Sequence, residues 1–199
     1  MIIIIFCLGV LIGLLLNLAV NRISYDLCEI KSDYVNFFIV FISGILFGIL
    51  FFRFGLSLTF IKGTVLTALL IIVSCVDLKH EIIPDKLWII SLISGLVFVF
   101  AGEISFISSL LGMLTGGLIL FLLALLPDAL GGGDIKIMFG LGALLGPYKT
   151  LAAIFLAFAL SAVVSIFLLL FKIKGRQDHI PFGPFLALGS FISFLMVLY

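Results

Sequence analysis

Apolar runs of membrane-crossing length follow one another along almost the whole chain. Stretches without a charged side chain cover residues 1–21, 34–52, 63–76, 87–102, 104–127, 137–148, 150–171 and 179–199. A helix needs about 20 residues to cross the hydrocarbon layer of a bilayer, and the first, second, fifth, seventh and eighth stretches reach that length. The pattern therefore predicts an all-α fold, a polytopic transmembrane helix bundle.

Three of the stretches are shorter than a full crossing. The third reaches crossing length with residues 58–62, because the Lys62 side chain can extend towards the headgroups. The fourth can extend into its flanks. The sixth, 135–147, rises only about 20 Å as a helix. We expect Gly146 and Pro147 to form the turn that separates the sixth span from the seventh, which gives about eight spans.

The basic residues indicate the orientation of these spans. With eight spans and the N-terminus outside, eight Lys and Arg residues lie in inner loops and three in outer loops, as the positive-inside rule requires. The inner set is Arg22, Lys31, Lys79, Lys86, Lys136, Lys172, Lys174 and Arg176, and the outer set is Arg53, Lys62 and Lys149. If 135–171 were a single crossing, the basic segment KIKGR would lie outside. We therefore predict eight spans with the N-terminus outside.

Composition agrees with an integral membrane protein. Hydrophobic residues make up 64% of the 199 residues and charged residues 11%, whereas a soluble domain has about 25% charged residues. We expect a single integral membrane domain over 1–199. The net charge of +1 does not indicate nucleic-acid binding. The first apolar run has no basic segment before it, so we expect it to remain as a membrane helix and not to be a cleaved signal. The three cysteines, Cys7, Cys28 and Cys75, form no C-x-x-C pair and are expected to be buried apolar side chains.

Two carboxylates stand at the ends of apolar runs on the same predicted side of the membrane. Asp77 ends the run LTALLIIVSCV, and Asp134 precedes the run IKIMFGLGALLG. Ionisable residues at membrane depth usually face the bundle interior or a water-filled cavity and are functional candidates. Either acid alone could be a surface charge in headgroup water. Two on one side, each beside an unusual loop, favour a functional pair.

Paired carboxylates indicate acid–base chemistry on a peptide bond. Two carboxylates at close range cannot both ionise easily, so one acts as a general acid and the other as a general base on a shared water. The sequence therefore predicts an aspartic peptidase. We predict no metal site, because His80 and His179 are the only histidines and the chain has no H-E-x-x-H motif.

The residues around Asp134 suggest how a substrate reaches it. Gly131, Gly132 and Gly133 have no side chains and can adopt positive φ, so they could form a loop that lets an extended substrate backbone approach. The alternative is a flexible connector. We expect Lys136 to belong to the same substrate-approach loop, where it either stabilises the charge of Asp134 or extends to the inner membrane surface.

These motifs resemble those of a known family, the type IV prepilin leader peptidases. GGGDIK at 131–136 matches the G-x-G-D signature of membrane aspartic peptidases, and VDLKHEIIPDKL at 76–87 is similar to the first aspartate motif of the family. IPFGPFLALG at 180–189 resembles its closing segment, and 8–23 its opening helix. The resemblance implies that Asp77 and Asp134 are catalytic. The resemblance also implies supporting roles for five further residues: Pro84, Asp85, Pro181, Gly183 and Pro184.

The resemblance also implies the setting of the reaction. Family members are multi-pass enzymes of the bacterial cytoplasmic (inner) membrane, with the active site facing the cytoplasm. Their partners are precursors of pilins and pilin-like secretion proteins, besides membrane lipid. They cut after a glycine, just before the apolar stem. The peptidase reaction needs no cofactor.

One departure from the family concerns methylation. Many members carry a large cytoplasmic insert with two C-x-x-C pairs and methylate the new N-terminus with S-adenosylmethionine. Here a short predicted cytoplasmic loop, 22–34, stands in place of the insert, with Cys28 alone. S-adenosylmethionine would be needed only if methylation is retained, and nothing in the sequence supports that activity.

The sequence fits three other functions less well. A presenilin-type intramembrane peptidase shares G-x-G-D, but its partner motif is Tyr-Asp, whereas Val76 precedes Asp77 here, and it has Pro-Ala-Leu in place of Pro-Phe-Gly-Pro. A small proton-coupled transporter has midplane carboxylates and inverted repeats. Here the acids lie at one face and no clear repeat is present. A non-catalytic assembly subunit is the third alternative.

Overall fold

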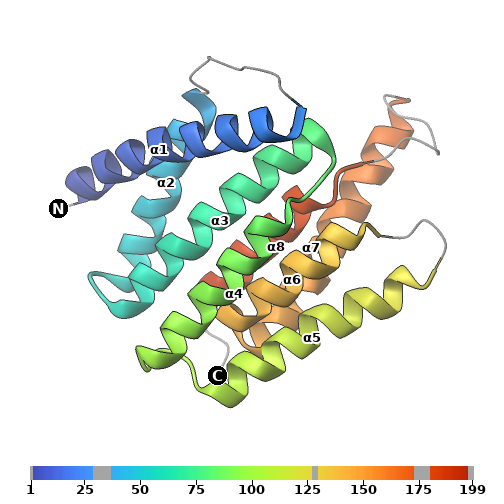
Figure 1. Cartoon of the computed structure of the whole chain (residues 1–199). Helices are drawn as coiled ribbons and strands as arrows, with labels where there is room; N and C mark the ends of the chain where they lie inside the picture. The colour runs from blue at the N-terminus through green and yellow to red at the C-terminus, as the bar shows by residue number, and fades with distance from the viewer. Residues whose placement is uncertain (1, 29–36, 127–129, 173–179, 197–199) are drawn as a thin grey trace. The chain divides into compact units, whose positions relative to one another are not determined.

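The computed structural model describes residues 2–28, 37–126, 130–172 and 180–196, and within them the chain is all-helical (Figure 1). This confirms the predicted fold class. The helices are α1 Ile2–Cys28, α2 Phe37–Phe54, α3 Leu58–His80, α4 Asp85–Phe100, α5 Phe106–Ala124, α6 Gly132–Leu145, α7 Pro147–Leu170 and α8 Gly183–Leu195.

Five of these helices are long and apolar enough to cross a membrane, so the chain is a multi-pass membrane protein. They are α1 over Ile4–Ser24, α2, α3, α5 and α7. Helices α4, α6 and α8 contain 16, 14 and 13 residues and are shorter than a full crossing. The count of eight spans and the outside N-terminus therefore stay predictions.

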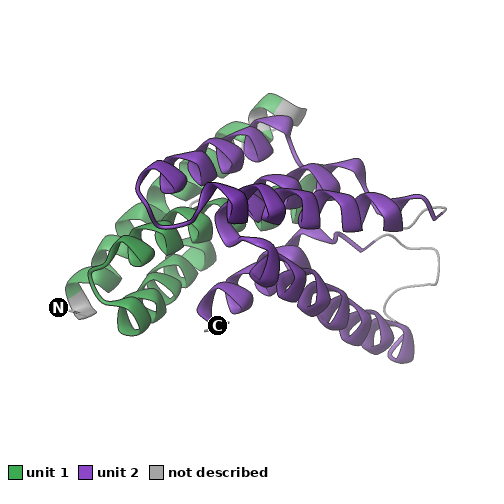
Figure 2. Ribbon diagram, turned by 90° about the horizontal axis from the view of Figure 1, so that it is seen from below, with its two compact units in different colours: residues 1–82 green, residues 83–199 purple. Residues whose placement is uncertain are grey.

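The contacts divide the chain into two compact units, residues 1–82 and 83–199 (Figure 2). Helices α1–α3 belong to the first unit and α4–α8 to the second. The expectation of a single domain over 1–199 stays a prediction. Part of the predicted loop 22–34 is helical, because α1 continues to Cys28, and residues 29–34 lie outside the described residues.

In the first unit, α1 and α2 pack closely because small residues face each other. A Cβ added at Gly9 would stand 2.9 Å from the Gly44 Cα, and the Ser43 hydroxyl donates a hydrogen bond to the Gly9 carbonyl at 2.8 Å. Small residues allow this close approach of membrane helices. A cluster of Leu16, Ile39 and Ile71 joins α1, α2 and α3.

In the second unit, α6 packs between α4 and α5. A Cβ at Gly116 of α5 would stand 2.5 Å from the Met138 carbonyl oxygen, and one at Gly140 would stand 2.7 Å from the Trp88 carbonyl oxygen of α4. Helix α8 packs antiparallel on α7, where the Ser193 hydroxyl donates to the Lys149 carbonyl at 2.6 Å. The contacts of Gly116 and Gly140 show that α6 is packed against α5 on one side and α4 on the other.

The predicted turn between the sixth and seventh spans is confirmed. Gly146 has a φ of 77°, a left-handed conformation that suits glycine, and its N–H donates to the Gly142 carbonyl at 2.9 Å. Pro147 follows as the first residue of α7, where its missing N–H leaves no helix hydrogen bond unmade.

Candidate active site

Asp77 lies in the last turn of α3 and is buried, with 5% of its surface exposed. Its carbonyl accepts a hydrogen bond from the Glu81 N–H at 2.8 Å, and Glu81 ends the helix in a left-handed conformation with a φ of 53°. Pro84 follows, and a proline disfavours helical geometry in the residue before it. The sequence thus ends α3 just beyond Asp77.

Asp134 is the third residue of α6 and is also buried, with 8% exposed. Its carboxylate oxygen Oδ2 accepts from the Gly131 N–H at 3.3 Å, and its own N–H donates to the Gly131 carbonyl at 3.1 Å. A carboxylate at this position satisfies one of the free N–H groups at the start of a helix, and its charge is favourable there. Asp134 therefore helps to start the helix that carries it.

Burial distinguishes these two acids from the others that the structure describes. Asp26, Glu81 and Asp85 are exposed, and Glu103 is partly exposed. Burying a carboxylate is unfavourable unless it gains partners, and buried acids with specific partners are concentrated at functional sites. Asp77 belongs to the first unit and Asp134 to the second, so their pairing stays a prediction.

The glycines before Asp134 do not form the loop that we expected from the sequence. Gly132 and Gly133 form the first turn of α6, and Gly131 caps it with a φ of −76°. Helical geometry prevails because the Asp134 carboxylate binds the Gly131 N–H and because Gly133 packs against Ile83, whose Cβ would lie 3.0 Å from an added Cβ. Their role in substrate approach stays a prediction.

Lys136 pairs with Asp85, a residue of the first aspartate motif. The Lys136 Nζ lies 2.6 Å from the Asp85 Oδ1. Residues two positions apart on a helix point about 200° apart, so Lys136 points away from Asp134. The two roles predicted for Lys136, stabilising the charge of Asp134 or extending to the inner membrane surface, stay predictions.

The other predicted supporting residues lie at the starts of helices. Pro84 immediately precedes α4 with an extended conformation, φ −63° and ψ 141°. Gly183 and Pro184 open α8, and Pro181 lies just before it. In Figure 1, helices α4, α6 and α8 of the second unit begin at the same end of that unit. Their functional roles stay predictions.

Two further residues contact the α6 segment and were missed in the sequence. Ile83 packs on Gly133, and the Trp88 ring lies edge-on to Phe139, with ring centroids 6.5 Å apart. The glycines at 131–133 were interpreted as an approach for substrate, and the sequence contained no signal that Ile83 or Trp88 contacts this segment.

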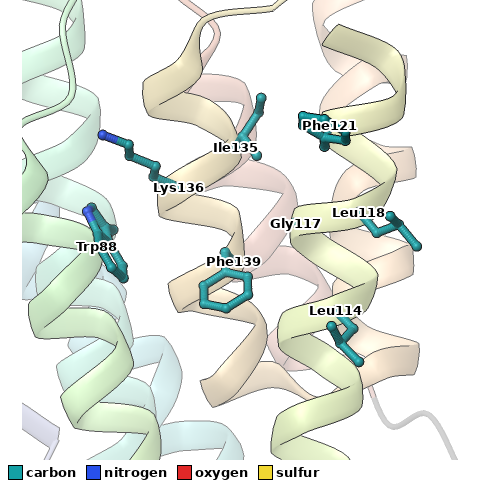
Figure 3. A pocket seen from close by; sticks show the side chains of 8 residues that line it. All are labelled: Trp88, Leu114, Gly117, Leu118, Phe121, Ile135, Lys136 and Phe139. Carbon is teal, nitrogen blue, oxygen red and sulfur yellow. The ribbon is translucent and has the colours of Figure 1, made fainter. Parts of the chain in front are cut away.

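A groove of about 370 Å³ lies between α4, α5 and α6 (Figure 3). Its lining is apolar except for Lys136 and comprises Trp88, Leu114, Gly117, Leu118, Phe121, Ile135, Lys136 and Phe139. Binding S-adenosylmethionine would require polar groups for its adenine, ribose and amino-acid portions. The groove does not fit that cofactor.

The described residues contain no cluster of three or more His, Cys, Asp or Glu side chains that could hold a metal ion. The prediction of a metal-free site stays a prediction.

A comparison with protein families matches residues 64–166 to the type IV leader peptidase family. The matched segment is more than half of the chain and includes both aspartate motifs. The chain belongs to the type IV leader peptidase family. Membership in this family does not favour the transporter or the presenilin-type alternative.

Known members of the family are similar over much of the chain. A prepilin leader peptidase/N-methyltransferase of Bacillus subtilis is 32% identical over 149 residues, which cover 72% of this chain and 58% of that protein. The protein of the same name from Neisseria gonorrhoeae is 30% identical over 84% of this chain and 59% of its own length. The protein of the same name from Aeromonas hydrophila is 31% identical over 68% of this chain and 49% of its own length. The chain thus spans about half the length of the curated relatives it matches. No solved structure matches the chain.

Proposed function

We propose that this leader peptidase family member is a membrane aspartic endopeptidase that cleaves the leader from type IV prepilins and pilin-like secretion proteins. The observation that carries the proposal is the burial of Asp77 and Asp134, the two buried acids among the described residues, each within a motif of the family segment 64–166. The name that the relatives share, prepilin leader peptidase/N-methyltransferase, supports the choice of substrate.

The chemistry requires one water and the two carboxylates. The ionised aspartate takes a proton from the water as the water oxygen attacks the carbonyl carbon of the peptide bond. The protonated aspartate donates its proton to the carbonyl oxygen. When the tetrahedral intermediate collapses, the C–N bond breaks and the leaving nitrogen takes the proton that the first aspartate removed from water. A hydroxyl of the intermediate returns its proton to the second aspartate as the new carboxyl group forms. No group beyond the two aspartates and water is needed.

The depth of the two acids suits a precursor with a basic leader and an apolar stem. Asp77 lies in the last turn of α3 and Asp134 in the first turn of α6, so each stands at the end of its helix and not at its middle. The scissile bond, between leader and stem, would lie at the same boundary of the membrane. The distribution of basic residues supports a cytoplasmic active site in the cytoplasmic membrane.

A cleavage assay tests the proposal. The purified protein in detergent is incubated with a pilin-like precursor, and the wild type is compared with Asp77→Asn and Asp134→Asn. Asn keeps the shape of the side chain but cannot transfer the proton, so each change alone should abolish cleavage without unfolding the protein. Glu103→Gln, which removes a carboxylate from the α4–α5 turn, is the matched control and should cleave normally. Cleavage that persists in either aspartate variant would contradict the proposal.

We further propose that the reaction ends with cleavage and that methyl transfer does not follow. Residues 22–34 contain neither of the two C-x-x-C pairs of the family's insert, and the groove between α4, α5 and α6 is apolar. Mass spectrometry of the product, formed with S-adenosylmethionine present, should show an unmodified new N-terminus. An added methyl group would contradict this.

A further inference from the structure

Helices α4 and α6 run parallel and contact each other residue by residue from their first turns. The contacts pair a residue of 83–95 with one of 133–143 at a nearly constant offset. In order they are Ile83 with Gly133, Asp85 with Lys136, Trp88 with Phe139, Ser91 with Gly140, and Gly95 with Ala143. The start of α6 is therefore aligned with the start of α4.

The first turn of α6 has little internal stability. Glycine is about 1 kcal/mol less favourable in a helix than alanine, and the turn contains Gly132 and Gly133 after the cap Gly131. A Cβ at Gly132 would meet no described atom within 4 Å, so none of the described residues packs against that position. The position of Asp134 therefore depends on contacts made by the residues that follow Gly132.

Two contacts with residues 83–85, just before and at the start of α4, can fix the position of the first turn of α6. Gly133 packs on Ile83, and the Lys136 ammonium pairs with the Asp85 carboxylate at 2.6 Å. Figure 3 shows Lys136 extending from α6 towards α4. The two side chains are 52% and 65% exposed, and such pairs typically stabilise a fold only slightly. We therefore expect this ion pair to affect the orientation of the first turn of α6 more than the global stability of the protein.

We propose that Asp85 and Lys136 are positioning residues: their ion pair holds the first turn of α6 against α4 and thereby fixes the carboxylate of Asp134. The inference rests on the proposed peptidase function and deepens it. It assigns a joint role to one residue from each aspartate motif. Neither residue touches the reacting atoms; both act through Asp134.

The test compares kcat and KM for cleavage of a model precursor with a basic leader, a glycine and an apolar stem. Asp85→Asn and Lys136→Met should each lower kcat about fivefold and leave KM within about threefold, because a small displacement of a catalytic group slows the reaction without weakening substrate binding. The exchange variant Asp85→Lys with Lys136→Asp should recover kcat to within about threefold of the wild type, because it restores the pair in reverse.

Lys172→Met is the matched control, since it removes the same charge two residues after the end of α7. It should leave kcat unchanged. The proposal is overturned if the exchange variant has a kcat no higher than that of Asp85→Lys alone and of Lys136→Asp alone. It is equally overturned if Asp85→Asn and Lys136→Met keep the wild-type kcat. A rise in KM without a fall in kcat would also overturn it, because it would mean that the pair binds substrate.

A second measurement does not depend on activity. In Asp85→Asn, the amides of residues 133–136 should exchange hydrogen about two- to fivefold faster than in the wild type, while those of α5 stay unchanged. Unchanged exchange at 133–136 would overturn the positioning role. If the wild type cleaves no precursor, the proposed function fails, and hydrogen exchange still decides whether the pair holds α6.

Discussion

The three glycines before Asp134 have three different surroundings. Gly131 donates its N–H to the Asp134 carboxylate, and Gly133 contacts Ile83. Gly132 lies in helical geometry, and no described atom lies within 4 Å of the place where a Cβ would stand. Packing among the described residues therefore explains glycine at 133 but not at 132, where we expect the small residue to serve the substrate.

This difference predicts opposite effects on stability and activity. Gly132→Ala should stabilise the protein by about 0.5–1 kcal/mol, because alanine favours the helix and restricts the unfolded chain. It should also lower kcat/KM for the precursor, because the methyl group occupies the approach to Asp134. Thermal unfolding in detergent and the cleavage assay measure the two effects.

Gly133→Ala is the comparison for that experiment. Its Cβ would stand 3.0 Å from the Ile83 Cβ, so the neighbouring segment must shift, and we expect lower stability together with lower activity. If Gly132→Ala is more stable and cleaves as well as the wild type, the substrate-approach role of Gly132 is wrong.

At the scale of elements, the contact between α5 and α6 depends on paired glycines. A Cβ at Gly112 would stand 2.8 Å from the Gly146 Cα and would overlap the Gly142 carbonyl oxygen, and one at Gly142 would stand 2.6 Å from the Gly112 carbonyl carbon. These neighbours are backbone atoms, which cannot rotate away as a side chain does.

We therefore expect Gly112→Ala and Gly142→Ala each to destabilise the protein by about 1–3 kcal/mol, measured by thermal unfolding in detergent. Gly48→Ala in α2 is the control, because an added Cβ there meets no described atom within 4 Å, and it should be neutral or slightly stabilising. Wild-type stability in both α5–α6 variants would mean that the two helices are not packed this closely.

The sequence predicted the elements better than it predicted their contacts. Long apolar runs and the Gly146-Pro147 pair carry local signals for helices and for a turn, and these predictions are confirmed. The glycines at 131–133 carry a local signal for a loop, but a carboxylate and a neighbouring isoleucine favour a helix there. The pairing of Lys136 with Asp85 spans 51 positions, and no local pattern encodes it.

At the scale of the whole molecule, the segment that defines the family extends across the boundary between the two units. It covers 64–166, with Asp77 before the boundary at 82 and Asp134 after it. The residues after the boundary, Ile83 to Asp85, contact α6 within the second unit. The first motif is thus divided: its catalytic candidate belongs to one unit, and its closing residues support the helix of the other catalytic candidate.

The number of crossings decides whether both candidates face the cytoplasm. If α3, α4, α5 and α6 all cross, the ends of these helices must alternate between the two sides of the membrane. Five exposed positions mark those ends: Leu56, Ile82, Ala101, Leu126 and Tyr148. Each is changed to cysteine in a chain whose native cysteines are replaced by alanine, and intact cells are treated with a membrane-impermeant maleimide.

We expect Leu56→Cys, Ala101→Cys and Tyr148→Cys to be labelled from outside, and Ile82→Cys and Leu126→Cys only after the membrane is opened. The reason is the positive-inside distribution, which places the N-terminus outside, together with one crossing for each helix. Helix α4 has 16 residues and is the critical case. If Ile82→Cys and Ala101→Cys were labelled from the same side, α4 would not cross. Only α5 would then cross the membrane between Asp77 and Asp134. The two carboxylates would lie on opposite sides of the membrane and could not share a catalytic water.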